Sequence, residues 1–241
     1  MTAANPFSLW VYLSQAPLLW LTVTLVVYAI ADAVSQASGR NPFLNPVVHA
    51  IWVIGVFLKL TGTSYSSYFS GAQFVHFLLG PVTVALAVPL YENRKIVMES
   101  ILPMLFALVV GCVTAIVSAV LLAEMAGLPR DIVLSLAPKS VTSGVAMGIS
   151  EALGGNPAVT AVATIITGIV GAIVVTPMMN AMGVRDFRAR GFAAGLASHG
   201  LGTARAFQVD EIAGAFAGIA MGLNALVTSL LVPAAVTLLV R

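Results

Sequence analysis

The fold of this chain is decided by an uncharged stretch, Pro103 to Ala123, which reads PMLFALVVGCVTAIVSAVLLA. A helix needs about 20 apolar residues to cross the hydrocarbon core of a bilayer. Cys112 lies inside this stretch and is the one cysteine of the chain, so we expect a packed thiol and no intramolecular disulfide. The stretch predicts a transmembrane helix.

The composition extends this prediction to the whole chain. Of its 241 residues, 59% are hydrophobic and 8% are charged, whereas soluble domains carry about 25% charged residues. The net charge is +2 and the basic residues are scattered, which argues against nucleic-acid binding. We therefore expect an all-α, polytopic membrane protein in contact with the lipid bilayer, with residues 1–241 forming a single transmembrane domain.

Apolar stretches separated by Gly, Pro, Asn or charge clusters recur along the sequence, which is typical of successive helices. The clusters lie at 38–42, 62–71, 91–95, 127–130, 154–157 and 183–190. We expect a bundle of about seven to eight membrane segments, with helices at 17–35, 45–60, 74–91, 98–124, 131–152, 157–182, 189–206 and 212–240.

Basic residues in short loops favour the cytoplasm, and the clusters Arg94-Lys95 and Arg185, Arg188 and Arg190 are therefore both placed inside. Three expected helices lie between these clusters, which would put them on opposite faces. Either one segment is re-entrant or the count differs by one, and we favour a re-entrant segment at 131–152.

Segment 45–60 is short for a membrane span. Two further segments are poor spans, because 131–152 contains Pro138 and Lys139 and 189–206 contains His199 and Arg205. Non-helical backbone at membrane depth persists only where protein or a water-filled cavity satisfies its polar groups. Both segments are therefore predicted to be broken or re-entrant and to lie in the protein interior.

The first candidate site is the stretch LAPKSVTSG, residues 136–144. Proline removes a backbone hydrogen bond, and a helix that starts after it would aim its N-terminal amides at an anion. Lys139 adds a charge, although it could instead extend to the membrane surface from a helix end. The candidate substrate-binding residues here are Pro138, Lys139, Ser140, Val141 and Thr142.

The second candidate site is the stretch ASHGLGTAR, residues 197–205. On a continuous helix, Ser198, Gly202 and Arg205 share one face, and His199 and Thr203 form the adjoining stripe. Two alternatives remain open: His199 could simply bind a backbone carbonyl, and Arg205 could pair with Asp210 or Glu211. The candidate residues are Ser198, His199, Gly200, Gly202, Thr203 and Arg205.

Residues 81–88 and 138–145 share a proline, a hydroxyl residue two positions later and two valines. Duplicated halves with interrupted helices are common in transporters, so Pro81 and Thr83 mark a possible second broken helix and an inverted repeat. Chance similarity between apolar stretches is the alternative. Motifs for nucleophilic catalysis, metal ligation and phosphate binding are missing from the sequence, and we expect neither an enzyme nor a bound metal or cofactor.

At these residues the chain resembles the LrgB/CidB family of bacterial membrane proteins, which is similar to the C-terminal half of the plastid glycolate/glycerate translocator. The matching stretches are LAPKSVT at 136–142, GGNPAVTA at 154–161, ASHGLGTARA at 197–206 and LGPVTVALA at 79–87. The chain departs from the family pattern at Ser143-Gly144, where Thr-Pro is common, and at Gly148, where the family has a nearby glutamate. The second departure puts a proton-coupling carboxylate in doubt.

The resemblance implies a multi-pass protein of the bacterial cytoplasmic membrane, a homo-oligomer such as a homodimer, with an LrgA/CidA-like membrane protein as a possible partner. It also implies one of two functions. The residues favour a transporter of small carboxylates (glycolate, pyruvate or lactate), in which the lysine, the arginine and the hydroxyls bind a monocarboxylate anion and His199 couples a proton. The alternative is an antiholin-like regulator of murein hydrolase export and autolysis, assembled through small-residue faces such as Gly214, Gly218 and Gly222.

Overall fold

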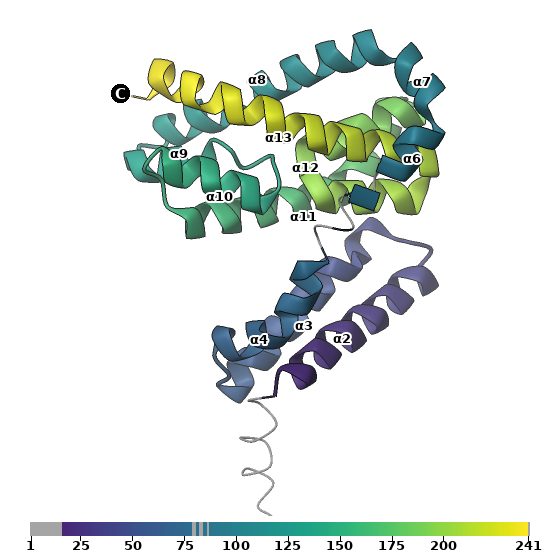
Figure 1. The fold of residues 1–241 in the computed structure, drawn as a ribbon, viewed down its shortest axis with the longest axis vertical. Coiled ribbons are helices and arrows are strands. Elements are labelled where there is room, and N and C mark those ends of the chain that lie inside the picture. The colour runs from purple at the N-terminus through teal and green to yellow at the C-terminus, as the bar shows by residue number, and fades with distance from the viewer. Residues whose placement is uncertain (1–15, 79–80, 82–83, 86, 241) are drawn as a thin grey trace, which may run out of the picture. The chain divides into compact units, whose positions relative to one another are not determined.

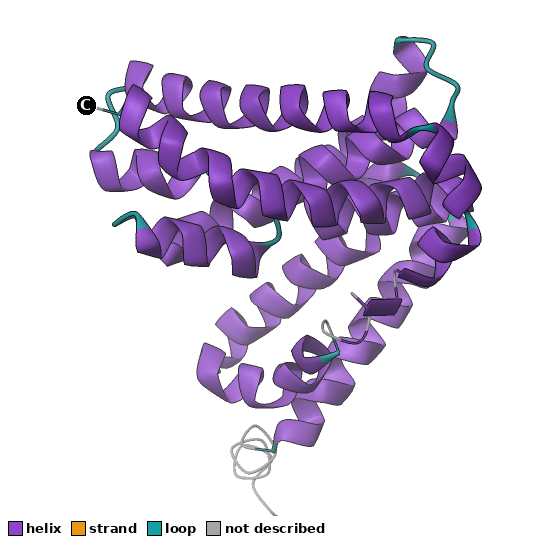
Figure 2. Ribbon diagram, turned by 45° about the horizontal axis from the view of Figure 1, so that its top comes forward, coloured by secondary structure: helices purple, strands orange, loops and turns teal. Residues whose placement is uncertain are grey.

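The computed structural model describes residues 16–240, except for 79–80, 82–83 and 86. Within these residues every regular element is a helix (Figures 1 and 2). The chain divides into two compact units, an N-terminal unit of residues 1–85 and a C-terminal unit of residues 86–241. The all-α prediction is confirmed for the described part of the chain.

The N-terminal unit is built on the packing of one helix against two others. Its elements are α2 (Pro17–Ala37), the 3-10 turn η1 (Pro42–Leu44), α3 (Pro46–Thr61) and α4 (Tyr65–Phe77). Trp20 of α2 is fully buried and makes edge-to-face contacts with Phe57 and Tyr68, at ring-centroid distances of 6.2 and 5.9 Å. Aromatic pairs of this geometry add to the energy of burial, so Trp20 holds α3 and α4 against α2.

The predicted loop at residues 62–71 is partly wrong, because α4 begins at Tyr65. Ser64 caps this helix by accepting the Ser67 amide at 3.2 Å, as an N-terminal serine commonly does. The expected span at 74–91 includes the end of α4, the helical residue Pro81 and α6, but its middle lies partly outside the described residues. The sequence suggested one helix there because its apolar stretch is nearly continuous.

The C-terminal unit contains α6 (Ala87–Glu92), α7 (Arg94–Glu99), α8 (Ile101–Met125), α9 (Arg130–Leu136), α10 (Ser143–Ala152), α11 (Pro157–Ala181), α12 (Phe187–Val209) and α13 (Glu211–Leu239) (Figure 1). The loop expected at 91–95 is reduced to Asn93 between α6 and α7. Four described helices are long and apolar enough to cross a membrane: α2, α8, α11 and α13.

Helix α8 shows why these helices belong in lipid. Its buried side chains recur every three or four residues and form one stripe: Met104, Leu108, Cys112, Ile116, Val120 and Ala123. Its other faces expose large apolar side chains, including Phe106 at 74%. Water would disfavour such a surface and hydrocarbon would not, so the chain is a multi-pass membrane protein.

Helices α12 and α13 approach each other through small residues. An ideal Cβ on Gly191 would lie 2.6 Å from the Ala213 carbonyl carbon, and one on Gly195 would lie 2.6 Å from that of Ala217. Only glycine allows backbones to come this close. Of the α13 glycines considered as an assembly face, Gly214 packs on Phe207 within the chain, whereas an ideal Cβ on Gly222 would have nothing within 4 Å in the described chain.

We expect Gly195→Ala to destabilise the protein by roughly 1–3 kcal/mol, because its methyl group would overlap the α13 backbone. Thermal unfolding in detergent measures this change. The matched control is Gly222→Ala, which gains about 1 kcal/mol of helix propensity and meets open space. Equal melting temperatures for the two variants would contradict the close approach of α12 to α13.

Candidate functional site

The first predicted break is present between α9 and α10. Helix α9 ends at Leu136 and α10 starts at Ser143. Two turn hydrogen bonds span the intervening residues, from the Lys139 amide to the Leu136 carbonyl and from the Val141 amide to the Pro138 carbonyl, both at 3.2 Å. Pro138 therefore ends the helix as the sequence predicted.

The second break lies within α12, at Ser198 and His199. Ser198 has φ −132° and ψ 15°, and His199 has φ 42° and ψ −133°. A positive φ is strained for a residue with a side chain and often marks a functional site. The backbone is therefore not helical at these two residues.

The chain reverses direction at this break. Phe187 and Val209, the first and last residues of α12, line the same cleft, and Ala194 packs in one buried cluster with Ala206. A straight helix of 23 residues would separate its ends by about 33 Å. Helix α12 is thus a hairpin of two arms, 187–197 and 200–209, with its tip at Ser198 and His199.

This reversal corrects the helical-wheel prediction. We expected Ser198, Gly202 and Arg205 on one face of a continuous helix, but the 100° projection does not carry across a non-helical break. Instead, Gly202 lies against the first arm, where an ideal Cβ would be 3.0 Å from the Ala194 carbonyl carbon. Gly202 therefore serves the packing of the two arms.

The two breaks meet at a residue that the sequence analysis did not select, Asn224 of α13. Its Nδ2 donates to the Ser140 carbonyl at 3.1 Å and to the Leu196 carbonyl at 2.8 Å. Its Oδ1 accepts from the Cys112 thiol at 3.1 Å and from the Thr228 hydroxyl at 2.7 Å. The buried amide thus uses its full hydrogen-bonding capacity to join α8, α13 and both interrupted segments.

The two interrupted segments carry hydroxyl groups, and the first also carries an ammonium group. Ser140 and Ser198 are buried, at 3% and 1% exposure, and Ser198 Oγ has no hydrogen-bond partner among the described residues. Lys139 is half-buried, and no ion pair or hydrogen bond of its ammonium group occurs within the described part of the chain. Thr142 precedes α10 without capping it through its side chain. Buried polar groups of this kind are candidates for a ligand contact.

The His199 ring packs against α11. Its Nε2 lies 2.9 Å from the Thr164 carbonyl oxygen, and the absent side chain of Gly168 leaves room for the ring, which would lie 2.6 Å from an ideal Cβ. The simpler alternative for His199, a bond to a backbone carbonyl, is therefore present. Because a carbonyl only accepts, Nε2 carries the hydrogen and Nδ1 is the nitrogen that can exchange a proton.

Thr203 and Arg205 lie on the returning arm of the hairpin. The Thr203 hydroxyl donates to the His199 carbonyl at 2.9 Å. The Arg205 side chain is 6% exposed, donates to Gln208 Oε1 at 3.3 Å and lines the cleft at the base of the hairpin. Asp210 caps α13 by accepting the amides of Ile212 and Ala213. The structure thus brings the 138–142 segment to the hairpin tip but leaves Arg205 at the hairpin base.

The second broken helix expected around residues 81–88 stays a prediction. Pro81 is helical and exposed, and Thr83 lies outside the described residues.

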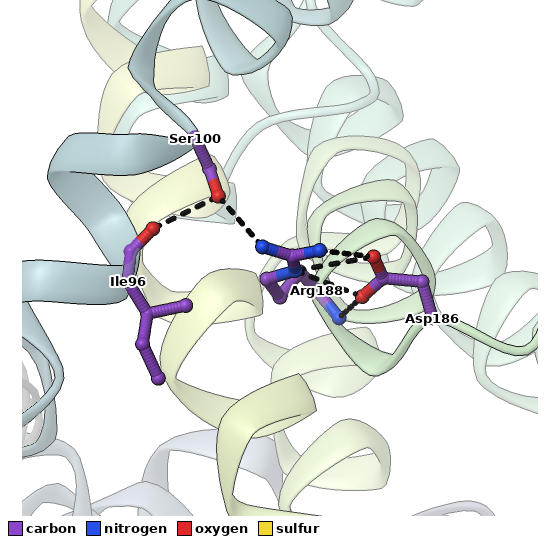
Figure 3. A network of polar contacts seen from close by, with 4 residues as sticks. All are labelled: Ile96, Ser100, Asp186 and Arg188. Carbon is purple, nitrogen blue, oxygen red and sulfur yellow. Dashed lines mark hydrogen bonds and ion pairs between the residues drawn. The ribbon is translucent and has the colours of Figure 1, made fainter.

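A polar network fixes the base of the first arm of α12 (Figure 3). Asp186 caps α12 by accepting the Arg188 amide at 2.9 Å, and it forms a 2.7 Å ion pair with the Arg188 guanidinium. Arg188 also reaches Ser100 Oγ at 3.4 Å, and Ser100 donates to the Ile96 carbonyl at 2.9 Å. The guanidinium holds the pKa of Asp186 below its usual range.

A sequence model described as the LrgB-like family matches residues 24–238, which include both breaks and Asn224. The chain belongs to the LrgB-like family. Holin-like protein CidB of Staphylococcus epidermidis is 32% identical over 220 residues, covering 91% of this chain and 96% of the relative. CidB of Staphylococcus aureus is 32% identical over 221 residues, covering 92% and 96%.

A further relative, the uncharacterized protein YxaC of Bacillus subtilis, is 36% identical over 197 residues, covering 82% of this chain and 86% of the relative. No solved structure matches this chain. The family membership that the motifs indicated is therefore confirmed over nearly the whole chain.

We expect Asn224→Leu, which keeps the size of the side chain, to destabilise the protein by roughly 2 kcal/mol, because two buried carbonyls lose their donor. Asn224→Asp should be worse, since a carboxylate would face the Ser140 and Leu196 oxygens. Thermal unfolding in detergent gives the order. The control is Thr237→Val on the same helix, which removes an exposed hydroxyl bound only within α13; a loss as large as that of Asn224→Leu would disprove the bridging role.

Proposed function

We propose that this protein transports small carboxylates of the glycolate, pyruvate or lactate class across the bacterial cytoplasmic membrane. The observation that carries the proposal is the meeting of two interrupted segments at Asn224. Interrupted helices that meet inside an apolar bundle are the usual construction of a transporter substrate site. A structure needed only for assembly has no use for two helix breaks, one of which is strained at His199.

The chemistry beside the junction suits an anion with a carboxylate and a hydroxyl or keto group. Lys139 supplies a positive charge, and α10, of ten residues, directs its N-terminal amides toward the break. The hydroxyls of Ser140, Thr142 and Ser198 are the groups that would bind the remaining oxygens. The Oγ of Ser198 is also buried without a hydrogen-bond partner in the described chain. A substrate oxygen would accept its hydrogen bond.

Two further roles belong to the hairpin. Nδ1 of His199 is the group that would couple proton movement to transport, since Gly148 stands where a family carboxylate is common. Arg205 remains part of the proposed anion pathway, at the hairpin base. The protein would act as a homo-oligomer, with or without an LrgA/CidA-like membrane partner.

We expect Lys139→Gln to reduce carboxylate uptake at least tenfold, because the substitution removes the charge at the junction while keeping a side chain of similar length. The measurement is uptake of labelled glycolate, lactate and pyruvate into proteoliposomes, with and without an inward proton gradient. Lys59→Gln is the matched control, because Lys59 is exposed near the end of α3. Arg205→Ala is expected to abolish uptake as well. Undiminished uptake in both site variants would refute the assignment of the site.

The second candidate function is a holin-like regulator of murein hydrolase export and autolysis. It is favoured by the names of the Staphylococcus relatives, holin-like protein CidB. A regulator of this kind would not need the charges of the site. Full control of lysis by a Lys139→Gln and Arg205→Gln double variant, together with no uptake by the unaltered protein, would favour it over transport.

A further inference from the structure

A groove lies between helix α8 and the first arm of α12, and Phe216 of α13 also lines it. Its volume is about 720 Å³. Small side chains leave this space open, because Ala107 of α8 and Ala189 and Ala193 of the first arm are among its lining residues. The groove is separate from the residues proposed to bind the transported anion.

The groove extends about half-way across the membrane. The residues of α8 that line it, between Pro103 and Gly111, are all apolar. From the start of α8 at Ile101 to Gly111 the helix rises about 15 Å, which is half of the hydrocarbon core of about 30 Å. The Leu196 side chain packs on Gly111 and closes this end. The apolar part of the groove therefore has the depth of one lipid leaflet.

The charged lining residues lie at the other end of the groove, where α8 and α12 begin. They are Glu99, Asp186 and Arg188. Asp186 and Arg188 neutralise each other through their 2.7 Å ion pair (Figure 3). Glu99 is exposed, and its carboxylate forms no hydrogen bond or ion pair with the residues that the structure describes. This mouth of the groove therefore has an excess negative charge.

Arg188 keeps two donors for an anion. A guanidinium has five N–H groups. The Nε hydrogen and one Nη2 hydrogen go to Asp186, and one Nη1 hydrogen goes to Ser100. One hydrogen on Nη1 and one on Nη2 are left over within the described chain, and the side chain is 43% exposed. Two such donors match two oxygens of a phosphate group.

We infer that this groove binds one phospholipid whose headgroup carries a primary ammonium, as in phosphatidylethanolamine. The phosphate binds the two remaining hydrogens of Arg188, the ammonium lies at Glu99, and one acyl chain fills the apolar groove as far as Leu196. The headgroup has one negative and one positive charge, which match the guanidinium and the excess carboxylate at the mouth. An anionic headgroup such as phosphatidylglycerol would leave Glu99 without a cation.

A transmembrane helix of a partner protein fits this groove less well. Such a helix needs about 30 Å of surface and is about 10–12 Å wide with its side chains, whereas the apolar groove ends after about 15 Å at Leu196. A lipid chain in the groove would support the first arm beside the junction, because the Leu196 carbonyl accepts from Asn224. The inference applies to a carrier and to a regulator alike.

The test counts bound lipids by native mass spectrometry of the full-length protein in detergent. Phosphatidylethanolamine, phosphatidylcholine and phosphatidylglycerol with identical acyl chains are added at increasing concentrations. We expect phosphatidylethanolamine to half-saturate the first site at a concentration about fivefold lower than the other two, which is the effect of one partly exposed ion pair. Glu99→Gln should remove this preference. Glu92→Gln is the matched control, because Glu92 is exposed at the end of α6 and does not line the groove.

A second variant tests the apolar part of the groove. Ala193→Leu fills the space that the acyl chain needs, so it should weaken binding of all three lipids at the first site. Ala234→Leu is its control, because it adds the same volume to an exposed position of α13. Glu99 is exposed and without a described partner, so Glu99→Gln keeps the test decisive even if Ala193→Leu fails to fold.

Three results would overturn the lipid site. One is equal binding of the three lipids by the unaltered protein. Another is a preference for phosphatidylethanolamine that survives in Glu99→Gln or is lost equally in Glu92→Gln, because the effect would then not come from the mouth of the groove. The third is a second protein chain that occupies the groove in place of lipid and is released by Ala193→Leu, which would make the groove a protein interface.

Discussion

The C-terminal unit depends on the amide of Asn224. In an apolar bundle, a backbone carbonyl released by a helix break has no water to bind, and leaving it unpaired costs roughly 1–3 kcal/mol. Asn224 supplies donors to one such carbonyl in each break, at Ser140 and at Leu196. The two interruptions are therefore tolerated together, through one side chain, and their relative position is fixed by it.

Small residues allow this arrangement to form. Gly191 and Gly195 bring the first arm of α12 against α13, which places Leu196 within reach of Asn224. Gly168 of α11 gives room to the His199 ring, and an ideal Cβ on Gly171 would lie 2.6 Å from Ser198 Cβ. The strained hairpin tip is thus surrounded by positions that only glycine can occupy, which offsets the lack of a hydrophobic driving force between helices in lipid.

The sequence predicted the elements of this site better than their arrangement. Pro138 and the polar stretch around His199 located both breaks, because prolines and ionisable residues are rare in a membrane span. The reversal of α12 could not be predicted, since helical periodicity assumes a continuous helix. Asn224 was missed because a single asparagine in an apolar helix carries no motif. The first part of α4, up to Gly71, was predicted as a loop because its serines and glycine resemble turn residues.

Cys112 gives the junction a built-in reporter. Its thiol is 1% exposed and donates to Asn224 Oδ1 at 3.1 Å, and the chain has no other cysteine. Because the sulfur is buried, a maleimide reaches it when the helices around it separate, so the rate of its alkylation follows the population of molecules in which the packing beside Asn224 has opened. The native sequence therefore permits the opening of the site to be timed without the introduction of a foreign label position.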